Sequence, residues 1–251
     1  MKNPYFKYFA ILLSVSIAFQ GCSLFGRKFE KPIYKQYVIN LNDKTGIKFE
    51  GLNGKIKVYP SEDSLAHFNV TGKVFVKQQN LDRVIEKEFI KIDSSGNIII
   101  IENNSDREIG YSNFHFGPLE NLIYELYVPG LKSLNLKNTN SSMEINNIGN
   151  DLTAEVTNGN IKVNKPYGNT DVKIINGKLT GSIDSIRGFS ADIANGKITM
   201  TIGANFSGSV TCSTENGSVR VSEGTFETKD IEKKNVFSGK TGSSDAKLKL
   251  S

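Results

Sequence analysis

The chain is poor in the residues that cross-link a fold or hold a metal. It has two cysteines, two histidines and no tryptophan among 251 residues. Two cysteines exclude a framework of several disulfides. His67 and His115 are far apart in the sequence, and neither is followed by a second histidine or a cysteine at a metal-binding spacing. We therefore expect no metal and no cofactor.

A one-sided charge is also absent. The formal net charge is +5, and loss of Lys2 and Lys7 with an export signal would leave +3. Acidic and basic side chains are interspersed along the predicted strands, as in the pair Asp171 and Lys173. Surfaces that bind nucleic acid gather Lys and Arg on one face instead. We therefore expect no nucleic-acid partner.

The amino terminus has the pattern of an export signal. Lys2 and Lys7 precede an apolar stretch of eleven residues, 9–19, which is too short for the roughly 20 residues that span a bilayer. The stretch is followed by Gln-Gly-Cys at residues 20–22, which resembles a bacterial lipoprotein signal. The resemblance implies cleavage before Cys22 and acylation of its sulfur. We expect residues 1–21 to be a signal peptide and residues 22–32 a tether to a lipid anchor in the bacterial cell envelope, at the outer membrane or facing the periplasm.

Most of the remaining chain alternates apolar and polar residues with period 2, which indicates half-buried β-strands. Residues 80–87 are the one segment that suits a short helix. No long linker interrupts the pattern, so we expect a single all-β domain over residues 33–251. Its first part, residues 33–130, is irregular, and residues 131–251 form regular repeats. In Ser-Val-Thr-Cys, residues 209–212, the alternation places Cys212 beside Val210 in the core.

An Asn-Gly pair recurs in the second half of the chain and defines these repeats. The asparagines at 158, 176, 195 and 216 are separated by steps of 18, 19 and 21 residues. Alternating apolar residues precede and follow each pair. An earlier, degenerate unit has Asn140-Ser141 at the same place, 18 residues before Asn158. The pairs themselves are Asn158-Gly159, Asn176-Gly177, Asn195-Gly196 and Asn216-Gly217. A near-constant short period is typical of stacked repeat architectures.

Two architectures fit this pattern. In a β-meander each Asn-Gly forms a hairpin turn, and Val156 pairs with Ile161 across it. In a β-solenoid each Asn-Gly is a corner between two short strands of one coil, and the glycine takes a positive φ. The corner asparagines then stack, and Val156, Ile174 and Ile193 occupy equivalent places in successive coils. Only stacking explains the shared period of about 18–21 residues, so we predict the solenoid.

The segment YELYVPGLKSLNLKNTNSSMEI from Tyr124, followed by the strand–NG–strand repeats, resembles the bacterial "putative adhesin" or toastrack-type β-strand-repeat domains. These are related to head-GIN proteins and often occur as envelope lipoproteins. The resemblance covers roughly residues 38–251. It implies a β-helix-like fold and brings no catalytic residues.

Motifs for catalysis are weak. Gly-Lys-Thr at 239–241 lacks the earlier glycine, the preceding strand and the following helix of a phosphate-binding loop, so we interpret it as a turn. Four carboxylates occupy outward strand positions, and a pair of them could face each other across coils, but we favour the interpretation that they belong to a charged solvent face. These four are Glu155, Asp171, Asp184 and Asp192.

The segment 103–121 is long for a loop in a compact β domain and is rich in aromatic residues. It is either a binding loop for glycan or protein, or a cap over an open end of the solenoid. Its candidate contact residues are Tyr111, Phe114, His115 and Phe116.

We expect a lipid-anchored envelope protein that is not an enzyme and acts as an adhesin-like interaction or structural module. An accessory or sensor domain of an envelope-stress system is the first alternative. A glycan-active β-helix enzyme is the second. The membrane is a partner through the lipid, and the other partner is an envelope protein or a glycan.

Overall fold

The computed structural model describes residues 28–41, 44–77, 90–103, 119–130, 133–184, 186–203, 206, 208–222, 228–230 and 236–241. These residues form thirteen strands joined through one continuous sheet. The strands are β1 (Lys28–Asn40), β2 (Gly46–Pro60), β3 (Leu65–Lys77), β4 (Ile90–Asp93), β5 (Ile98–Asn103), β6 (Leu119–Val128), β7 (Ser133–Asn146), β8 (Asp151–Asn164), β9 (Thr170–Ile183), β10 (Phe189–Ile202), β11 (Gly208–Ser222), β12 (Thr228–Asp230) and β13 (Val236–Thr241).

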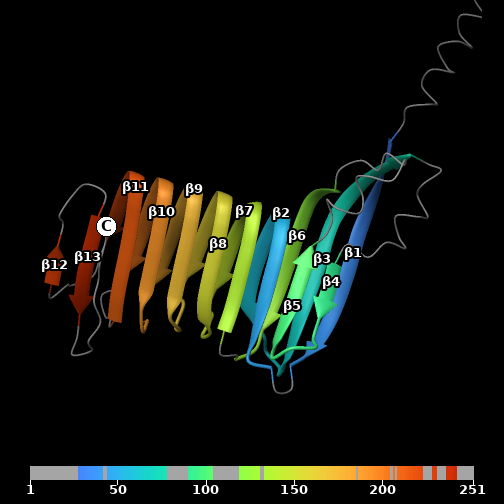
Figure 1. The fold of residues 1–251 in the computed structure, drawn as a ribbon, viewed down its shortest axis with the longest axis horizontal. Helices are drawn as coiled ribbons and strands as arrows, with labels where there is room; N and C mark the ends of the chain where they lie inside the picture. The colour runs from blue at the N-terminus through green and yellow to red at the C-terminus, as the bar shows by residue number, and fades with distance from the viewer. Residues whose placement is uncertain are drawn as a thin grey trace, which may run out of the picture.

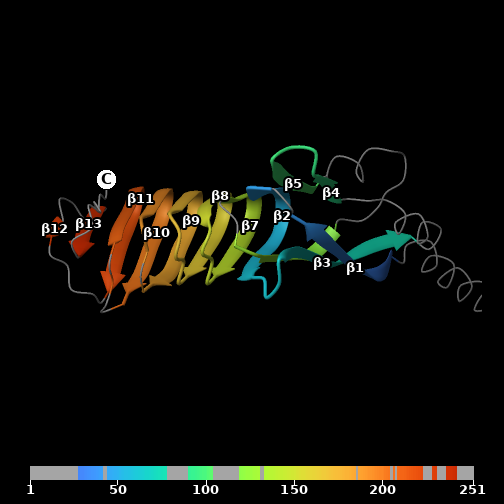
Figure 2. The ribbon, with the colours of Figure 1, turned by 90° about the horizontal axis from the view of Figure 1, so that it is seen from below.

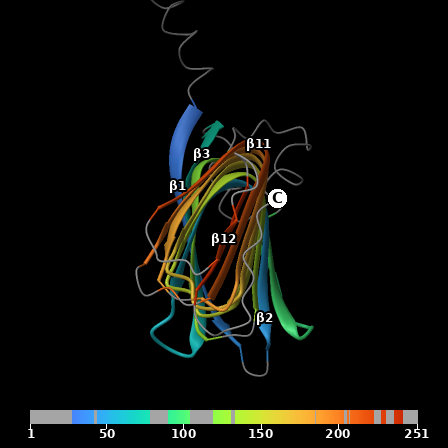
Figure 3. The ribbon, with the colours of Figure 1, turned by 90° about the vertical axis from the view of Figure 1, so that its left-hand side faces the viewer.

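Six of these strands form a stack of parallel coils in the order β2, β7, β8, β9, β10 and β11. Each is long and bends once near its middle, so the stack appears in Figures 1 and 3 as a row of arches. We call the part before the bend the first arm and the part after it the second arm. The two arms of a coil carry their apolar side chains into the space between them.

The solenoid prediction is confirmed, and the meander is excluded. Val156 pairs with Ile174, and Ile174 pairs with Ile193, in parallel register. The prediction of two short strands per repeat is wrong in one respect: each repeat is one continuous strand of 14 or 15 residues. The strand is continuous because the pairing register continues through the bend, where Asn158 is matched to Asn176 and Gly159 to Gly177.

The core lies between the arms. In β7, Leu134 and Leu136 of the first arm and Met143 and Ile145 of the second arm are each at most 1% exposed. The same alternation recurs in β8, β9 and β10, where the inward positions are buried and the outward positions are not. Burial of each such side chain contributes about 1.5–3 kcal/mol, so the repeats are held together mainly through this interior.

The first arms form one layer of the sheet and the second arms form another, and these two layers, which we call the two sheets, separate at the amino-terminal end of the stack. The first arm of β2 pairs with β5, which pairs with β4, whereas the second arm of β2 pairs with β6, followed by β3 and β1. Figure 2 shows β4 and β5 lying apart from β1 and β3. Aromatic rings fill the widened interior, with Phe49, Phe68 and Tyr124 at centroid distances of 5.2–6.1 Å. Tyr124 also accepts a hydrogen bond from Asn103 of β5, which links the two sheets.

Two boundary predictions differ from the structure. The region 33–130 was expected to be irregular throughout, yet β2 is a complete coil with its own corner at Asn53-Gly54. Its membership is hidden in the sequence because β3, β4, β5 and β6 are inserted between β2 and the next coil. The expected tether, residues 22–32, also ends early, since β1 begins at Lys28 and pairs there with Lys77.

At the other end, β13 runs antiparallel to the first arm of β11 and carries β12 on its outer side. The expected signal peptide 1–21, Cys22, the short helix 80–87 and the residues Tyr111, Phe114, His115 and Phe116 lie outside the described residues. Within the described part of the chain there is no helix long and apolar enough to cross a membrane.

Candidate functional site

The predicted corner residues come together in one column. Each corner asparagine donates its side-chain Nδ2 to the Oδ1 of the asparagine in the preceding coil. The ladder runs from Asn53 through Asn140, Asn158, Asn176 and Asn195 to Asn216, with distances of 3.3, 3.1, 2.9, 3.0 and 3.0 Å. Because these amides bond to one another from coil to coil, the column stabilises the corner.

The corner glycines are required by close approach of the coils. Gly159, Gly177 and Gly196 have φ angles of +152°, +157° and +157°, as predicted. Gly217 was expected to share this conformation, but its φ lies outside that range. A Cβ at Gly217 would nevertheless lie 2.8 Å from the carbonyl carbon of Gly196, so crowding alone excludes a larger residue there.

The outer face of the first arms carries a column of alternating charge, three residues before each corner asparagine. Its members are Glu50, Lys137, Glu155, Lys173, Asp192 and Ser213, matched in register from coil to coil. Lys137 lies 3.7 Å from Glu155, and the Ser213 hydroxyl donates to Asp192 at 2.8 Å. We call this column the charge ladder. Side chains of opposite charge are therefore neighbours along the first arms.

A groove of about 530 Å³ runs beside the charge ladder, on the side away from the corners. It crosses the first arms of all six coils, a span of about 24 Å at the usual strand spacing. Short polar side chains form much of its wall: Asn135, Asp151, Thr153, Asn169, Asp171, Ser190 and Thr211. We call it the polar groove. It offers hydroxyl, amide and carboxylate groups in repeated positions and no exposed aromatic ring.

The two carboxylates of the polar groove are held by neighbours. Asp151 Oδ1 accepts hydrogen bonds from the backbone N–H and the side-chain amide of Asn169, at 2.9 and 3.1 Å. Asp171 lies 3.4 Å from the ammonium of Lys173. Asn169, next to the following coil, therefore orients the carboxylate of Asp151, and Lys173 of the same strand orients that of Asp171. Both carboxylates are hydrogen-bond acceptors.

A second hollow, of about 370 Å³, lies on the corner side of the charge ladder. Thr139, Thr157, Ile175 and Ala194 line it, and Ile175 is 51% exposed. It is shorter and more apolar than the polar groove. The charge ladder thus divides the first-arm face into a polar strip and a partly apolar strip.

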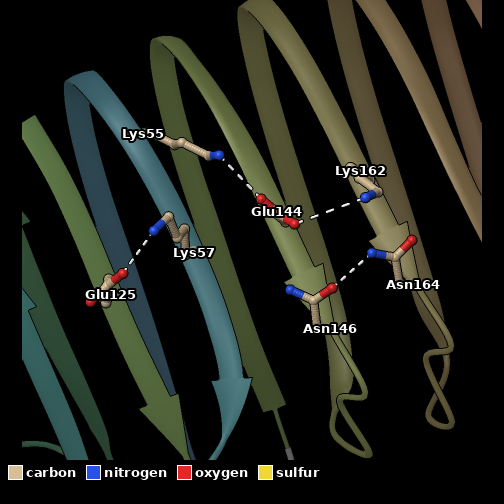
Figure 4. Close-up of polar contacts among 7 residues, drawn as sticks. All are labelled: Lys55, Lys57, Glu125, Glu144, Asn146, Lys162 and Asn164. Atoms are coloured by element: carbon tan, nitrogen blue, oxygen red, sulfur yellow. Dashed lines mark hydrogen bonds and ion pairs between the residues drawn. The ribbon is translucent and has the colours of Figure 1, made fainter. Parts of the chain in front are cut away.

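The outer face of the second arms is organised around Glu144 at its amino-terminal end. Glu144 lies 3.1 Å from Lys55 and 3.9 Å from Lys162, and Lys57 pairs with Glu125 at 2.8 Å (Figure 4). The hydrogen bond from Lys55 lowers the pKa of Glu144, and the nearby charges of Lys162 and Lys57 act in the same direction. Asn164 donates to Asn146 at 2.7 Å beside them. Each of these three lysines therefore has a carboxylate partner, and Glu144 is shared by two of them.

One further hollow, of about 360 Å³, lies where β1, β3 and β6 meet the turn after β2. His67 Nε2 lies 2.9 Å from Asp63 Oδ2, and this contact lowers the pKa of Asp63. Tyr127 lines the hollow and stacks on Tyr59 with a centroid distance of 5.5 Å. The Ser61 hydroxyl also lines the hollow, but it donates to Asp63 at 3.0 Å and not to His67, so the histidine does not activate it as a nucleophile and we assign no reaction to this hollow.

Metal and thiol chemistry have no site among the residues that the structure describes. They contain no group of three or more His, Cys, Asp or Glu that could hold a metal ion. Cys212 is fully buried, and burial raises the pKa of its thiol far above the usual range, so it is unreactive in the folded chain.

The sequence interpretation missed one corner. Asn53-Gly54 is followed by Lys-Ile-Lys-Val, and Asn158-Gly159 is followed by Asn-Ile-Lys-Val. This near-identity was available, but the step of 87 residues to Asn140 hides it from any search for a fixed period.

The four carboxylates considered for a cleft do not converge. Glu155 and Asp192 lie on the charge ladder, and Asp171 lies in the polar groove. Asp184 pairs with Lys165 in a turn at 2.8 Å.

Comparisons with known proteins give similar structures at low identity. No family model matches the chain, and no curated protein matches it. A "putative cell adhesion protein" from Clostridium sporogenes is similar at 15% identity, with a TM-score of 0.43 over 88% of this chain and 93% of that one. A "putative adhesin" from Bacteroides fragilis is similar at 14% identity, with a TM-score of 0.37 over 76% and 97%. A "putative lipid binding protein" from Parabacteroides distasonis is similar at 15% identity, with a TM-score of 0.31 over 77% and 93%.

Proposed function

We propose that the chain is a lipid-anchored, non-enzymatic binding module of the bacterial cell envelope, and that the polar groove binds an extended, largely neutral glycan. The polar groove is the observation that carries the proposal. Its long, shallow course across six coils suits a chain-like ligand, and its short Ser, Thr, Asn and Asp side chains supply both donors and acceptors for sugar hydroxyls.

A glycan suits the groove better than a peptide strand. A peptide that adds to a sheet needs an edge with unpaired backbone groups. The groove instead crosses the strands at right angles, where the backbone groups of β7, β8, β9 and β10 are paired on both sides. Recognition therefore depends on side chains, and the carboxylates of Asp151 and Asp171 are fixed as acceptors by their neighbours.

The envelope location rests on the export signal and Cys22. Two or three acyl chains would anchor the protein stably, since each buried CH₂ contributes about 0.8 kcal/mol. The stack of coils would then hold the groove at a fixed place relative to β1, the first strand after the anchor segment. We assign no reaction, because the groove presents no activated nucleophile.

The test is binding of neutral oligosaccharides of increasing length, measured by calorimetry. Affinity should rise with length up to the span of the groove. Thr153→Arg places a long side chain in the middle of the groove and should weaken binding at least about tenfold. Ser142→Arg makes the same kind of change on the second-arm face and should leave binding unchanged. Equal effects of the two substitutions, or affinity that does not depend on length, would refute the proposal.

A further inference from the structure

The second-arm face of the last three coils differs from every other part of the surface described above. Nine outward residues occupy it: Lys178, Thr180, Ser182, Lys197, Thr199, Thr201, Ser218, Arg220 and Ser222. Three are cations, six bear hydroxyl groups, and none is a carboxylate. We call this surface the cationic face.

The three cations have no counter-charge among the described residues. Lys178, Lys197 and Arg220 form no ion pair there, in contrast to Lys55, Lys57 and Lys162 on the preceding coils of the same face (Figure 4). Asp184 lies in the turn that follows β9, but it is already paired with Lys165. The pairing of each lysine with a carboxylate, seen from β6 to β8, therefore stops at β9.

Register makes the imbalance sharper. Lys197 is matched directly to Lys178 across the β9–β10 pair, so two ammonium groups project side by side from strands about 4.8 Å apart. Like charges at this separation repel. In the same two coils the charge ladder matches Asp192 to Lys173, so opposite signs meet on the other face. In these two coils, charge is compensated on the first-arm face and is uncompensated on the second-arm face.

We propose that the cationic face binds an anionic polysaccharide, whose carboxylate or phosphate groups lie against Lys178, Lys197 and Arg220. The hydroxyl groups between the cations can donate to and accept from sugar hydroxyls, which favours a glycan over a bare polyanion. A membrane surface is less suited, since peripheral surfaces insert apolar or aromatic side chains and none of the nine residues is of that kind. The proposal goes beyond the polar groove and does not depend on it.

The test uses the full-length chain carrying Cys22→Ser, so that an acyl anchor cannot account for binding. The probes are alginate as a carboxylate-bearing polysaccharide, dextran as a neutral one, polyphosphate as a polyanion without sugar, and phosphatidylglycerol vesicles. We expect binding to alginate that weakens as salt is raised, because exposed charges are screened over about 10 Å at 0.1 M ionic strength. We expect weaker binding to polyphosphate and none to dextran at the cationic face or to the vesicles.

Two matched triple variants locate the site. Lys178→Gln, Lys197→Gln and Arg220→Gln together should weaken alginate binding at least about tenfold, as three exposed ion pairs of modest strength would. Lys48→Gln, Lys137→Gln and Lys173→Gln remove the same charge from the first-arm face and should change it less than about twofold. Equal losses in the two variants would overturn the proposal, because attraction by net charge alone would then suffice. Vesicle binding lost with the first variant would overturn it in favour of a membrane.

The variants distinguish the two binding proposals. Thr153→Arg should reduce neutral oligosaccharide binding and leave alginate binding intact, whereas the cationic-face variant should do the reverse. Circular dichroism should show the same strand content for all variants, since every changed side chain is on an outer face.

Discussion

Gly177→Ala tests the close stacking of the corners at a single atom. The added Cβ would overlap the carbonyl oxygen of Gly159 and would lie 2.7 Å from its carbonyl carbon, where ordinary contact begins at 3.4 Å. The alanine would also have to adopt the φ of +157° that glycine holds there. The two coils must therefore move apart locally, or the corner must change its backbone conformation.

The structure sets the size of the effect. Separation of the coils weakens the hydrogen bond from Asn176 to Asn158, now 2.9 Å, which is a loss of about 1 kcal/mol. An alanine in a sparsely populated backbone region costs a further 1–3 kcal/mol or so. We expect Gly177→Ala to lower the free energy of unfolding by about 2–4 kcal/mol.

Urea unfolding followed by circular dichroism measures this difference. Gly149→Ala is the matched control, because a Cβ at Gly149 meets nothing within 4 Å. The control should be neutral or stabilising by up to about 1 kcal/mol, since alanine restricts the unfolded chain. If Gly177→Ala and Gly149→Ala unfold at the same urea concentration, the tight corner assigned here is incorrect.

Three further predictions concern other parts of the chain. Cys22→Ser should move the protein from the membrane fraction to the soluble fraction, and mass spectrometry showing an unmodified amino terminus in the wild type would contradict the lipid anchor. Glu144→Gln should lower stability by about 0.2–1 kcal/mol at pH 7. Because the folded pKa of Glu144 is depressed, its contribution is present above the ordinary value of 4.5 and is lost as pH falls through the folded pKa, so variant and wild type should converge at low pH. Cys212 should resist iodoacetamide in the folded protein and react after unfolding in urea, and rapid alkylation of the native chain would show that the core is open there.

The sequence predicts the fold well where one physical constraint repeats. Period-2 alternation identifies the inward residues, and the recurring Asn-Gly identifies the corner, so the stacking of Val156 on Ile174 follows from residue spacing alone. The prediction of two short strands fails because alternation breaks at the corner, where side chains no longer alternate between the core and solvent, although the register continues through it. The separation of the sheets beyond β2 depends on tertiary pairing between segments far apart in sequence, which leaves no local pattern.

The polar groove and the cationic face were not predicted, because each is a property of columns that cross the strands. A column becomes visible only when each coil is counted from its own corner asparagine. Counting three residues back gives Glu50, Lys137, Glu155, Lys173, Asp192 and Ser213, and counting two residues forward gives Lys55, Ser142, Asn160, Lys178, Lys197 and Ser218.

Counting from the corner asparagine finds equivalent positions in every coil, because the steps of 18, 19 and 21 residues between corners differ only in the length of the turns between coils. In those turns the backbone pairing continues by other routes, such as Lys165 N–H donating to the Ser182 carbonyl at 2.8 Å. Turn length can therefore vary without shifting the register of the arms, whereas a one-residue insertion within an arm would move the later side chains of that arm to the opposite face. The corner asparagine fixes the register, and the register decides which charges meet. The alternating charge ladder and the unbalanced cationic face thus follow from the same stacking.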